Sequence, residues 1–150
     1  MHSLKELFDN ITTKLHSGEH LMHLDNILEE YKAQDWHDHI KFSDIRYVKN
    51  LVFSNEYIDV FIICWNINQS SGIHDHPENG CLMKVLDGKL REDVYTKNNN
   101  QYEFMCSSTL EKDGIAYKEG NQCIHNIINA VDKTISLHIY SPSGFKTTYY

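Results

Sequence analysis

The sequence predicts a mainly β protein, a small β-barrel or double-sheet jelly roll preceded by two short N-terminal α-helices. Three observations predict this class. The first 42 residues carry apolar side chains at helical spacing, later runs are rich in β-branched and aromatic residues, and turn residues separate those runs closely. With 150 residues and 41% hydrophobic content, we expect one domain over 1–150, with a helical part over 1–42, a barrel over 43–142 and a short tail over 143–150.

Two helices are expected at the N-terminus. The first is predicted by apolar residues three or four positions apart: Leu4, Leu7, Phe8, Ile11 and Leu15. Ser17 and Gly18 end it. A second helix is predicted over 21–31, with these side chains on one side: Leu24, Ile27, Leu28 and Tyr31.

At least seven strands are expected after Phe42. The strongest candidates are 47–53, 57–65, 81–86, 89–95, 123–128 and 134–140. Asp87-Gly88 predicts a short hairpin between two of them, whereas 98–100 is interpreted as a loop and 112–114 as a turn.

The composition excludes several classes of partner. The net charge is −7 without a basic run, which argues against nucleic acid and against an anionic membrane. The longest apolar run, 57–65, is too short to span a bilayer. The N-terminus mixes acids with apolar residues and does not resemble a signal peptide. We therefore expect a cytoplasmic monomer with reduced cysteines.

A metal site is predicted around Gly72–Gly88. His74 and His76 are two residues apart, so on a strand their side chains point the same way. His125, in a later strand, is the best third ligand. Imidazole suits iron, zinc, copper and nickel, and three facial ligands leave open positions for substrate and oxygen.

Other histidines are interpreted as structural. His37 and His39 repeat the His-Asp-His tripeptide but lack the cysteine and glycine frame that follows His76. A further trio has near-helical spacing interrupted by Gly18 and is expected on a solvated face: His16, His20 and His23.

The spacing His74-x-His76, Cys81, Gly88 and then His125 resembles the two motifs of the cupin superfamily. In most cupins a glutamate that also binds metal stands at the position of Cys81. Its absence leaves three neutral imidazoles, so the full charge of a divalent cation remains at the metal. Such a site should favour an anionic sulfur ligand.

The strand 134–140 alternates strictly. Ser136, His138 and Tyr140 share one face, opposite three apolar residues. Periodicity leaves two interpretations open: a hydrogen-bonded relay from hydroxyl to imidazole to phenol, or an exposed sheet face with ordinary polar residues.

Several separated motifs, in order, resemble the cysteine dioxygenase family over about residues 45–142. They are Tyr47-Val-Lys-Asn-Leu-Val52, Cys64-Trp65, Ser71-Gly-Ile-His-Asp-His76, Cys81, His125 and Ser136-Leu-His-Ile-Tyr-Ser-Pro142. The resemblance implies one Fe(II) per chain held by three residues: His74, His76 and His125. It implies O2 as co-substrate and oxidation of L-cysteine to cysteine sulfinic acid.

The resemblance also implies roles for other residues. Cys81 and Tyr140 match a pair that can be joined by a thioether bond, and Ser136 and His138 match the residues hydrogen-bonded behind that tyrosine. Tyr140 would orient substrate and oxygen. The Ser141–Pro142 bond is expected to be cis, as such bonds tend to be in the family.

The chain departs from the family at Lys49, where an arginine normally grips the substrate carboxylate. Tyr47 and Lys49 share a strand face and are the predicted substrate-binding residues, whereas Arg46 should face away. An ammonium offers a point charge instead of a planar two-pronged grip. The alternative is a surface lysine. The short tail leaves two further alternatives: weaker substrate enclosure, or an oligomer that supplies the cover.

We therefore expect an iron-dependent thiol dioxygenase acting on a small thiol, with L-cysteine as the leading candidate substrate. One rival is dioxygenation of another small thiol such as 3-mercaptopropionate. Another is a non-catalytic cupin that binds metal or thiol as a sensor and consumes no oxygen.

Overall fold

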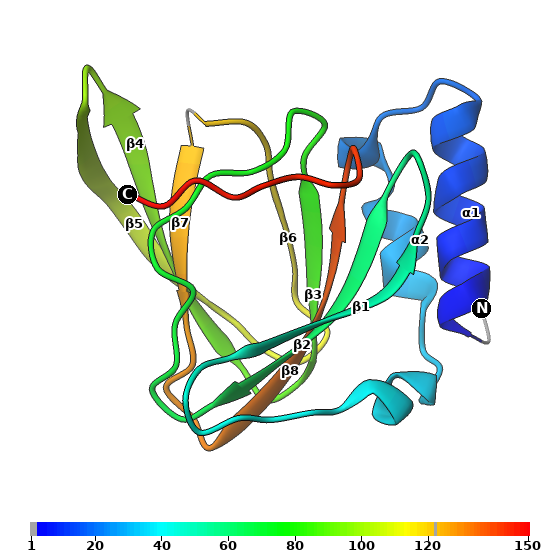
Figure 1. Ribbon diagram of the computed structural model, residues 1–150, viewed down its shortest axis with the longest axis horizontal. Helices are drawn as coiled ribbons and strands as arrows, with labels where there is room; N and C mark the ends of the chain where they lie inside the picture. Colours follow the sequence, from blue (N-terminus) through cyan, green and yellow to red (C-terminus); the bar gives the residue numbers. More distant parts are fainter. Residues whose placement is uncertain (1–2, 122) are drawn as a thin grey trace.

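The computed structural model describes residues 3–121 and 123–150, and its strands form two facing sheets (Figure 1). The five-stranded sheet has the order β1-β2-β8-β3-β6 and the three-stranded sheet the order β5-β4-β7. The strand bounds are β1 Val48–Ser54, β2 Asp59–Asn66, β3 Cys81–Asp87, β4 Leu90–Asn98, β5 Gln101–Leu110, β6 Ile115–Lys118, β7 Cys123–Ile128 and β8 Lys133–Tyr140. The predicted mainly β jelly roll is confirmed, with the described strands arranged as two sheets that do not close into one barrel.

The helical part is more broken than the sequence predicted. Helix α1 spans Leu4–His16, and the side chain of Ser3 caps it by accepting from the backbone N–H of Glu6. The second predicted helix, 21–31, is two pieces instead: η1 Leu21–His23 and α2 Asp25–Glu30. Leu24 departs from helical geometry (φ −105°, ψ 13°) and separates them, although its side chain stays buried. A further short turn, η2, spans Asp35–His39.

The predicted hairpin at Asp87-Gly88 is wrong, because β3 and β4 lie in different sheets. The hydroxyl of Thr134 donates to the carbonyl of Lys89 (3.1 Å) and accepts from its N–H (3.3 Å), which docks this turn on the start of β8. Gly88 has φ +84°, and a Cβ there would lie 2.4 Å from Thr134 Oγ1. The turn therefore carries the chain from one sheet to the other.

The hairpin in this part of the chain is β4–β5, at the predicted asparagine loop. Asn99 and Asn100 both have positive φ (47° and 66°), as a two-residue type I′ turn requires. Strand β5 is exposed along most of its length, including the apolar side chains of Tyr102 and Phe104 that alternate along it.

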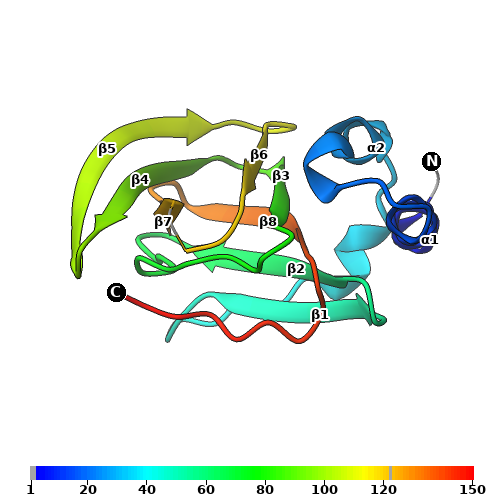
Figure 2. The ribbon, with the colours of Figure 1, turned by 90° about the horizontal axis from the view of Figure 1, so that it is seen from above.

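Alternation in the five-stranded sheet separates two apolar clusters. One face of β8 carries Ile135, Leu137 and Ile139, which pack in the cluster that includes α1 and α2. The other face carries Ser136, His138 and Tyr140, which are buried on the side facing the second sheet. Figure 2 shows α1 and α2 gathered on one side of the strands. The helices thus cover one face and leave the inner face for a site.

No helix among the described residues is long and apolar enough to cross a membrane. The Ser141–Pro142 peptide bond is cis, as the resemblance implied.

Candidate metal centre and adjoining pocket

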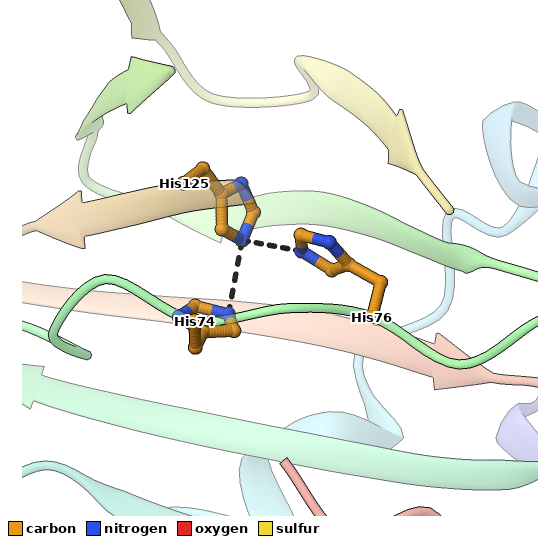
Figure 3. Close-up of side chains that lie close together, drawn as sticks. All are labelled: His74, His76 and His125. Carbon is orange, nitrogen blue, oxygen red and sulfur yellow. Dashed lines mark hydrogen bonds between the residues drawn. The ribbon is translucent and has the colours of Figure 1, made fainter. Parts of the chain in front are cut away.

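Three buried histidines from two segments meet between the sheets (Figure 3). His125 lies in β7, as expected. His74 and His76 lie in an extended loop between β2 and β3, where the sequence suggested a strand. The backbones of His74 and His125 exchange two hydrogen bonds (3.0 and 3.2 Å), which fixes the loop against β7.

The Nε2 atoms of the three rings converge. Nε2 of His125 lies 2.9 Å from Nε2 of His76 and 3.1 Å from Nε2 of His74. One ligand atom from each ring lies within 4.8 Å of the others. This is the grouping that a mononuclear metal site requires, and it involves the three residues predicted as ligands.

The hydrogen-bond network assigns the ring protons of two of these histidines. Nδ1–H of His74 donates to the carbonyl of Gly72 (2.8 Å), and Nδ1–H of His125 donates to the carboxylate of Glu92 (2.7 Å). A neutral imidazole has one N–H, so the Nε2 atoms of His74 and His125 face one another with lone pairs. That contact is repulsive until a cation lies between the two nitrogens.

Burial keeps these rings neutral. Desolvation is the largest cause that lowers the pKa of His74 and holds the pKa of His125 well below its ordinary value. Three imidazoles form a donor set that suits Fe(II), zinc, copper or nickel and does not suit the oxygen-seeking Mg²⁺ or Ca²⁺. The residues present therefore fit the predicted iron.

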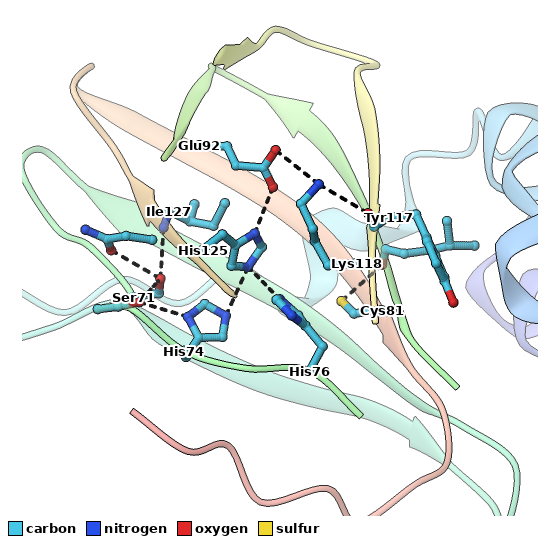
Figure 4. Close-up of polar contacts among 12 residues, drawn as sticks. Ser71, His74, His76, Cys81, Glu92, Tyr117, Lys118, His125 and Ile127 are labelled. Atoms are coloured by element: carbon cyan, nitrogen blue, oxygen red, sulfur yellow. Dashed lines mark hydrogen bonds and ion pairs between the residues drawn. The ribbon is translucent and has the colours of Figure 1, made fainter. Parts of the chain in front are cut away.

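Glu92 is a site residue that the sequence interpretation missed (Figure 4). Its carboxylate accepts from His125 and lies 3.6 Å from Nζ of Lys118 on β6, and the glutamate is buried. A carboxylate behind a ligating histidine orients the ring and raises its basicity. The available signal was a strand Leu90-Arg-Glu92-Asp-Val94 with a carboxylate on the same face as two apolar residues.

Cys81 and Tyr140 are brought together. They stand directly opposite one another on the antiparallel strands β3 and β8, so their side chains share a face. Both are nearly buried, at 5% and 8% exposure. Burial is the main cause that raises the pKa of each, and for Tyr140 the nearness of Cys81 is the next. The thiol of Cys81 and the phenol of Tyr140 are thus adjacent, and both are protonated.

Behind Tyr140 the structure contains a buried hydrogen-bond chain. Trp65 Nε1–H donates to Ser136 Oγ (2.9 Å), and Ser136 Oγ lies 2.9 Å from His138 Nε2. An indole only donates, so Ser136 accepts from Trp65 and also bonds His138. The rings of His138 and Tyr140 lie edge to face, with centroids 6.3 Å apart. The polar face of β8 is therefore internal, so the exposed-face interpretation is wrong. The hydroxyl-to-imidazole link of the predicted relay is present, whereas the imidazole and phenol are joined by a ring contact.

A pocket adjoins His74 and is lined by both predicted substrate-binding residues, Tyr47 and Lys49. Nζ of Lys49 lies 4.4 Å from the ring centroid of Phe61 and 4.3 Å from that of Tyr140. Desolvation lowers the pKa of Lys49. Tyr47 stacks on Trp65, with centroids 4.7 Å apart. Lys49 is therefore an inward-facing ammonium between two aromatic rings, whereas Arg46 is exposed.

The histidines interpreted as structural lie away from this centre. His37 stacks on Trp36 (3.8 Å) and is exposed in η2, and His39 is half-buried there. His16 bonds the phenol of Tyr57 (2.6 Å), while His20 caps η1 and His23 is exposed.

Comparison with known proteins identifies a family that the chain matches over almost its whole length. The family model described as cysteine dioxygenase type I matches residues 2–149. The chain is 32% identical to cysteine dioxygenase type 1 of Danio rerio over 126 residues, 78% of this chain and 63% of that protein. It is 32% identical to the Homo sapiens protein of the same name over 124 residues, 77% and 62% of the respective chains. The matched part of this chain thus spans somewhat less than two thirds of the length of these relatives.

Solved structures share the fold. A conserved protein with a double-stranded β-helix domain from Klebsiella pneumoniae superposes with a TM-score of 0.63 at 16% identity, covering 80% of this chain and 92% of that one. A cupin superfamily protein from Desulfitobacterium hafniense superposes with a TM-score of 0.57 at 10% identity, covering 75% and 92%. At such identities the likeness concerns the fold alone.

Proposed function

The chain belongs to the cysteine dioxygenase type I family, and from that premise we propose that it is an iron-dependent thiol dioxygenase whose substrate is L-cysteine. The observation that carries the proposal is the convergence of three imidazoles beside a pocket that also holds a half-buried ammonium. The first offers a place for a metal, and the second offers a place for a carboxylate. A small thiol acid has a group for each.

The proposed metal ligands are His74, His76 and His125, with one Fe(II) per chain. When bound, the iron supplies the position at which the thiolate sulfur and O2 are brought together. The reaction adds both atoms of O2 to the sulfur of the thiol and gives a sulfinic acid, so no further reductant is needed. The protein's own part is to bind, orient and enclose the substrate.

Lys49 is the proposed carboxylate partner. Its ammonium lies inside the pocket, between the rings of Phe61 and Tyr140, where little water competes for it. A charge-assisted hydrogen bond in such surroundings is stronger than one in water. The stacked ring of Tyr47 forms the neighbouring wall and is the second proposed substrate-binding residue.

Tyr140 is proposed to orient substrate and oxygen, and Ser136 and His138 are proposed to steady the polar wall behind it. The chain from Trp65 through Ser136 supports this role, because its hydrogen bonds hold the imidazole of His138 in place. Cys81 is proposed to join Tyr140 through a thioether. In that step the Cys81 sulfur bonds to a ring carbon, the thiol and the ring each lose one hydrogen, and O2 accepts the two electrons and two protons.

The test is oxygen uptake by protein loaded anaerobically with Fe(II). We expect L-cysteine to start oxygen consumption and to yield cysteine sulfinic acid in equal amount. A sensor would bind thiol and leave oxygen untouched, and a merely structural fold would retain no stoichiometric iron. Either result would exclude the proposed activity.

One observation favours a second candidate substrate, 3-mercaptopropionate. The described residues that line the pocket include Lys49 but no acidic side chain that would pair with a substrate ammonium. A thiol acid that lacks the amine would therefore lose no contact with the protein relative to cysteine. If the amine of cysteine contributes nothing at the metal, 3-mercaptopropionate should reach a higher kcat/KM than cysteine in the same assay.

A further inference from the structure

The segment that follows β8 returns to the metal-binding loop. Figure 1 shows it, in red, running from the end of β8 toward β4 and β7. Its backbone is tied to the loop that carries His74: the N–H of Asp75 donates to the carbonyl of Thr148 (3.1 Å), and the N–H of Tyr150 donates to the carbonyl of Ile73 (2.9 Å). The N–H of Thr148 also donates to the carboxylate of Asp75 (2.8 Å). Residues 148–150 therefore lie as a short added strand beside residues 73–75.

These ties place Tyr149 at the pocket. Tyr149 and Thr147 line it together with Tyr47 and Lys49. The Tyr149 ring lies 6.2 Å, between centroids, from the ring of His74. The other side of Tyr149 faces solvent, since the residue is 57% exposed. Tyr149 thus stands between solvent and the pocket at the proposed metal ligand.

Two neighbours fix the position of that ring. A Cβ built on Gly72 would lie 3.5 Å from Tyr149 Cδ1, an ordinary van der Waals distance, so the ring packs against the loop at Gly72. The phenol of Tyr149 lies near that of Tyr47, and its nearness raises the pKa of Tyr47 after the larger effect of burial. Tyr47 in turn stacks on Trp65 at the back of the pocket. Tyr149 and Tyr47 together therefore extend from the loop that carries His74 to the pocket wall at Trp65.

We propose that Tyr149, paired with Tyr47, is a specificity-determining residue that closes the pocket and limits its occupants to compact thiol acids. Thiols that carry an additional group on the amine or on the carboxylate would have to displace the ring. This inference rests on the proposed function for the nature of the ligand, and it concerns which thiols enter and not whether oxygen reacts. It answers the question of enclosure raised by the sequence: the tail supplies cover from the same chain.

The size limit is tested by anaerobic binding, which requires no turnover. Dissociation constants of the Fe(II)-loaded protein are measured for L-cysteine, for N-acetyl-L-cysteine and for L-cysteinylglycine. We expect Tyr149→Ala to reduce the preference for cysteine over at least one larger thiol by about tenfold, the scale of a steric exclusion in a binding pocket. Tyr149→Phe keeps the ring and should retain the preference. Tyr102→Ala, a tyrosine exposed on β5, is the matched control.

A second readout needs neither metal nor thiol. The chain has two tryptophans, so Trp36→Phe leaves Trp65 as the sole indole fluorophore. In that background Tyr149→Ala should increase acrylamide quenching of Trp65, which is 1% exposed and lines the pocket, and Tyr102→Ala should not.

The outcomes separate this inference from the proposed function. Unchanged thiol preference and unchanged quenching in Tyr149→Ala would overturn the inference even if the protein makes sulfinate. A reduced preference together with increased quenching would support it even if no sulfinate forms, a result that would remove only the proposed activity. Failure of the wild-type protein to bind any of the three thiols would contradict both.

Discussion

Lys49 is the residue at which substrate binding should depend most on pH. Desolvation lowers its pKa, so on the alkaline side its charge is lost at a lower pH than that of an exposed lysine. The KM for L-cysteine should therefore rise as pH increases through that lowered pKa. Lys49→Arg keeps its charge throughout and should show a flatter KM over the same range. Parallel KM profiles for the two proteins would show that Lys49 does not hold the carboxylate.

The carboxylate–histidine pair predicts a metal-affinity effect at a single residue. Glu92→Ala removes the acceptor of the Nδ1–H of His125 and should weaken Fe(II) binding by about 10–100-fold, the usual effect of losing such a partner. Competition with a chromophoric chelator measures this without turnover. Glu103→Ala, on the exposed strand β5, should leave the affinity unchanged. Equal affinities in all three proteins would contradict the role of Glu92.

The Cys81–Tyr140 pair predicts a covalent change that intact mass reports. After aerobic turnover with iron and cysteine, part of the protein should have lost two hydrogen atoms, because the two residues are opposed on β3 and β8. Cys81→Ala should abolish that species, and Cys106→Ala, at an exposed cysteine, should retain it. Loss of the species in both variants would point to a different cysteine reaction.

At the scale of elements, one buried lysine fastens the helical part to the sheet. Lys84 of β3 is 1% exposed, and its ammonium donates to the carbonyls of Leu28 (3.1 Å) and Tyr31 (2.9 Å) at the end of α2. The carbonyl of Leu28 also accepts from the N–H of Tyr31 (3.2 Å), whereas the carbonyl of Tyr31 lies just beyond the helix end, where helical partners are lost.

Lys84→Met keeps the apolar stem but removes the ammonium that pairs with the carbonyl of the buried residue Tyr31. We expect the free energy of unfolding to fall by about 2 kcal/mol, because a buried polar group that loses its hydrogen-bond partner destabilises the folded state by that order. Urea denaturation followed by far-UV circular dichroism measures it. Lys112→Met changes an exposed lysine in the same region and should alter stability little. A Lys84→Met protein as stable as the wild type would show that the helix end is satisfied in another way.

Elements with strong alternation were predictable, and elements set by tertiary contacts were not. Strand β8 followed from its period-two pattern because its apolar face packs toward the helices. The Asp87-Gly88 turn has hairpin chemistry, yet it carries the chain between sheets because Thr134 binds both polar groups of the Lys89 backbone. Local sequence carries no information on that distant hydroxyl. Strand β5 was missed although Tyr102 and Phe104 alternate with Glu103 in its sequence, and both of these aromatic side chains are exposed.

At the scale of the whole molecule, the jelly roll gives the two faces of one sheet different tasks. The helices cover one face, while the inner face and the opposing sheet enclose the histidines, the Cys81–Tyr140 pair and Lys49. The three histidines were predictable because each stands in a recognisable frame in the sequence. Glu92, Lys118 and Tyr149 were not, because their contributions come from strands and a tail that meet the site only after folding.

The most direct test of the thiol dioxygenase proposal uses isotopic oxygen. Fe(II)-loaded protein is given L-cysteine and ¹⁸O2, and the product is analysed by mass spectrometry beside the His125→Ala variant. We predict cysteine sulfinic acid in which both sulfinate oxygens are labelled, and no such product from the variant. Iron-containing wild-type protein that forms no doubly labelled sulfinate from L-cysteine or 3-mercaptopropionate would contradict the proposal.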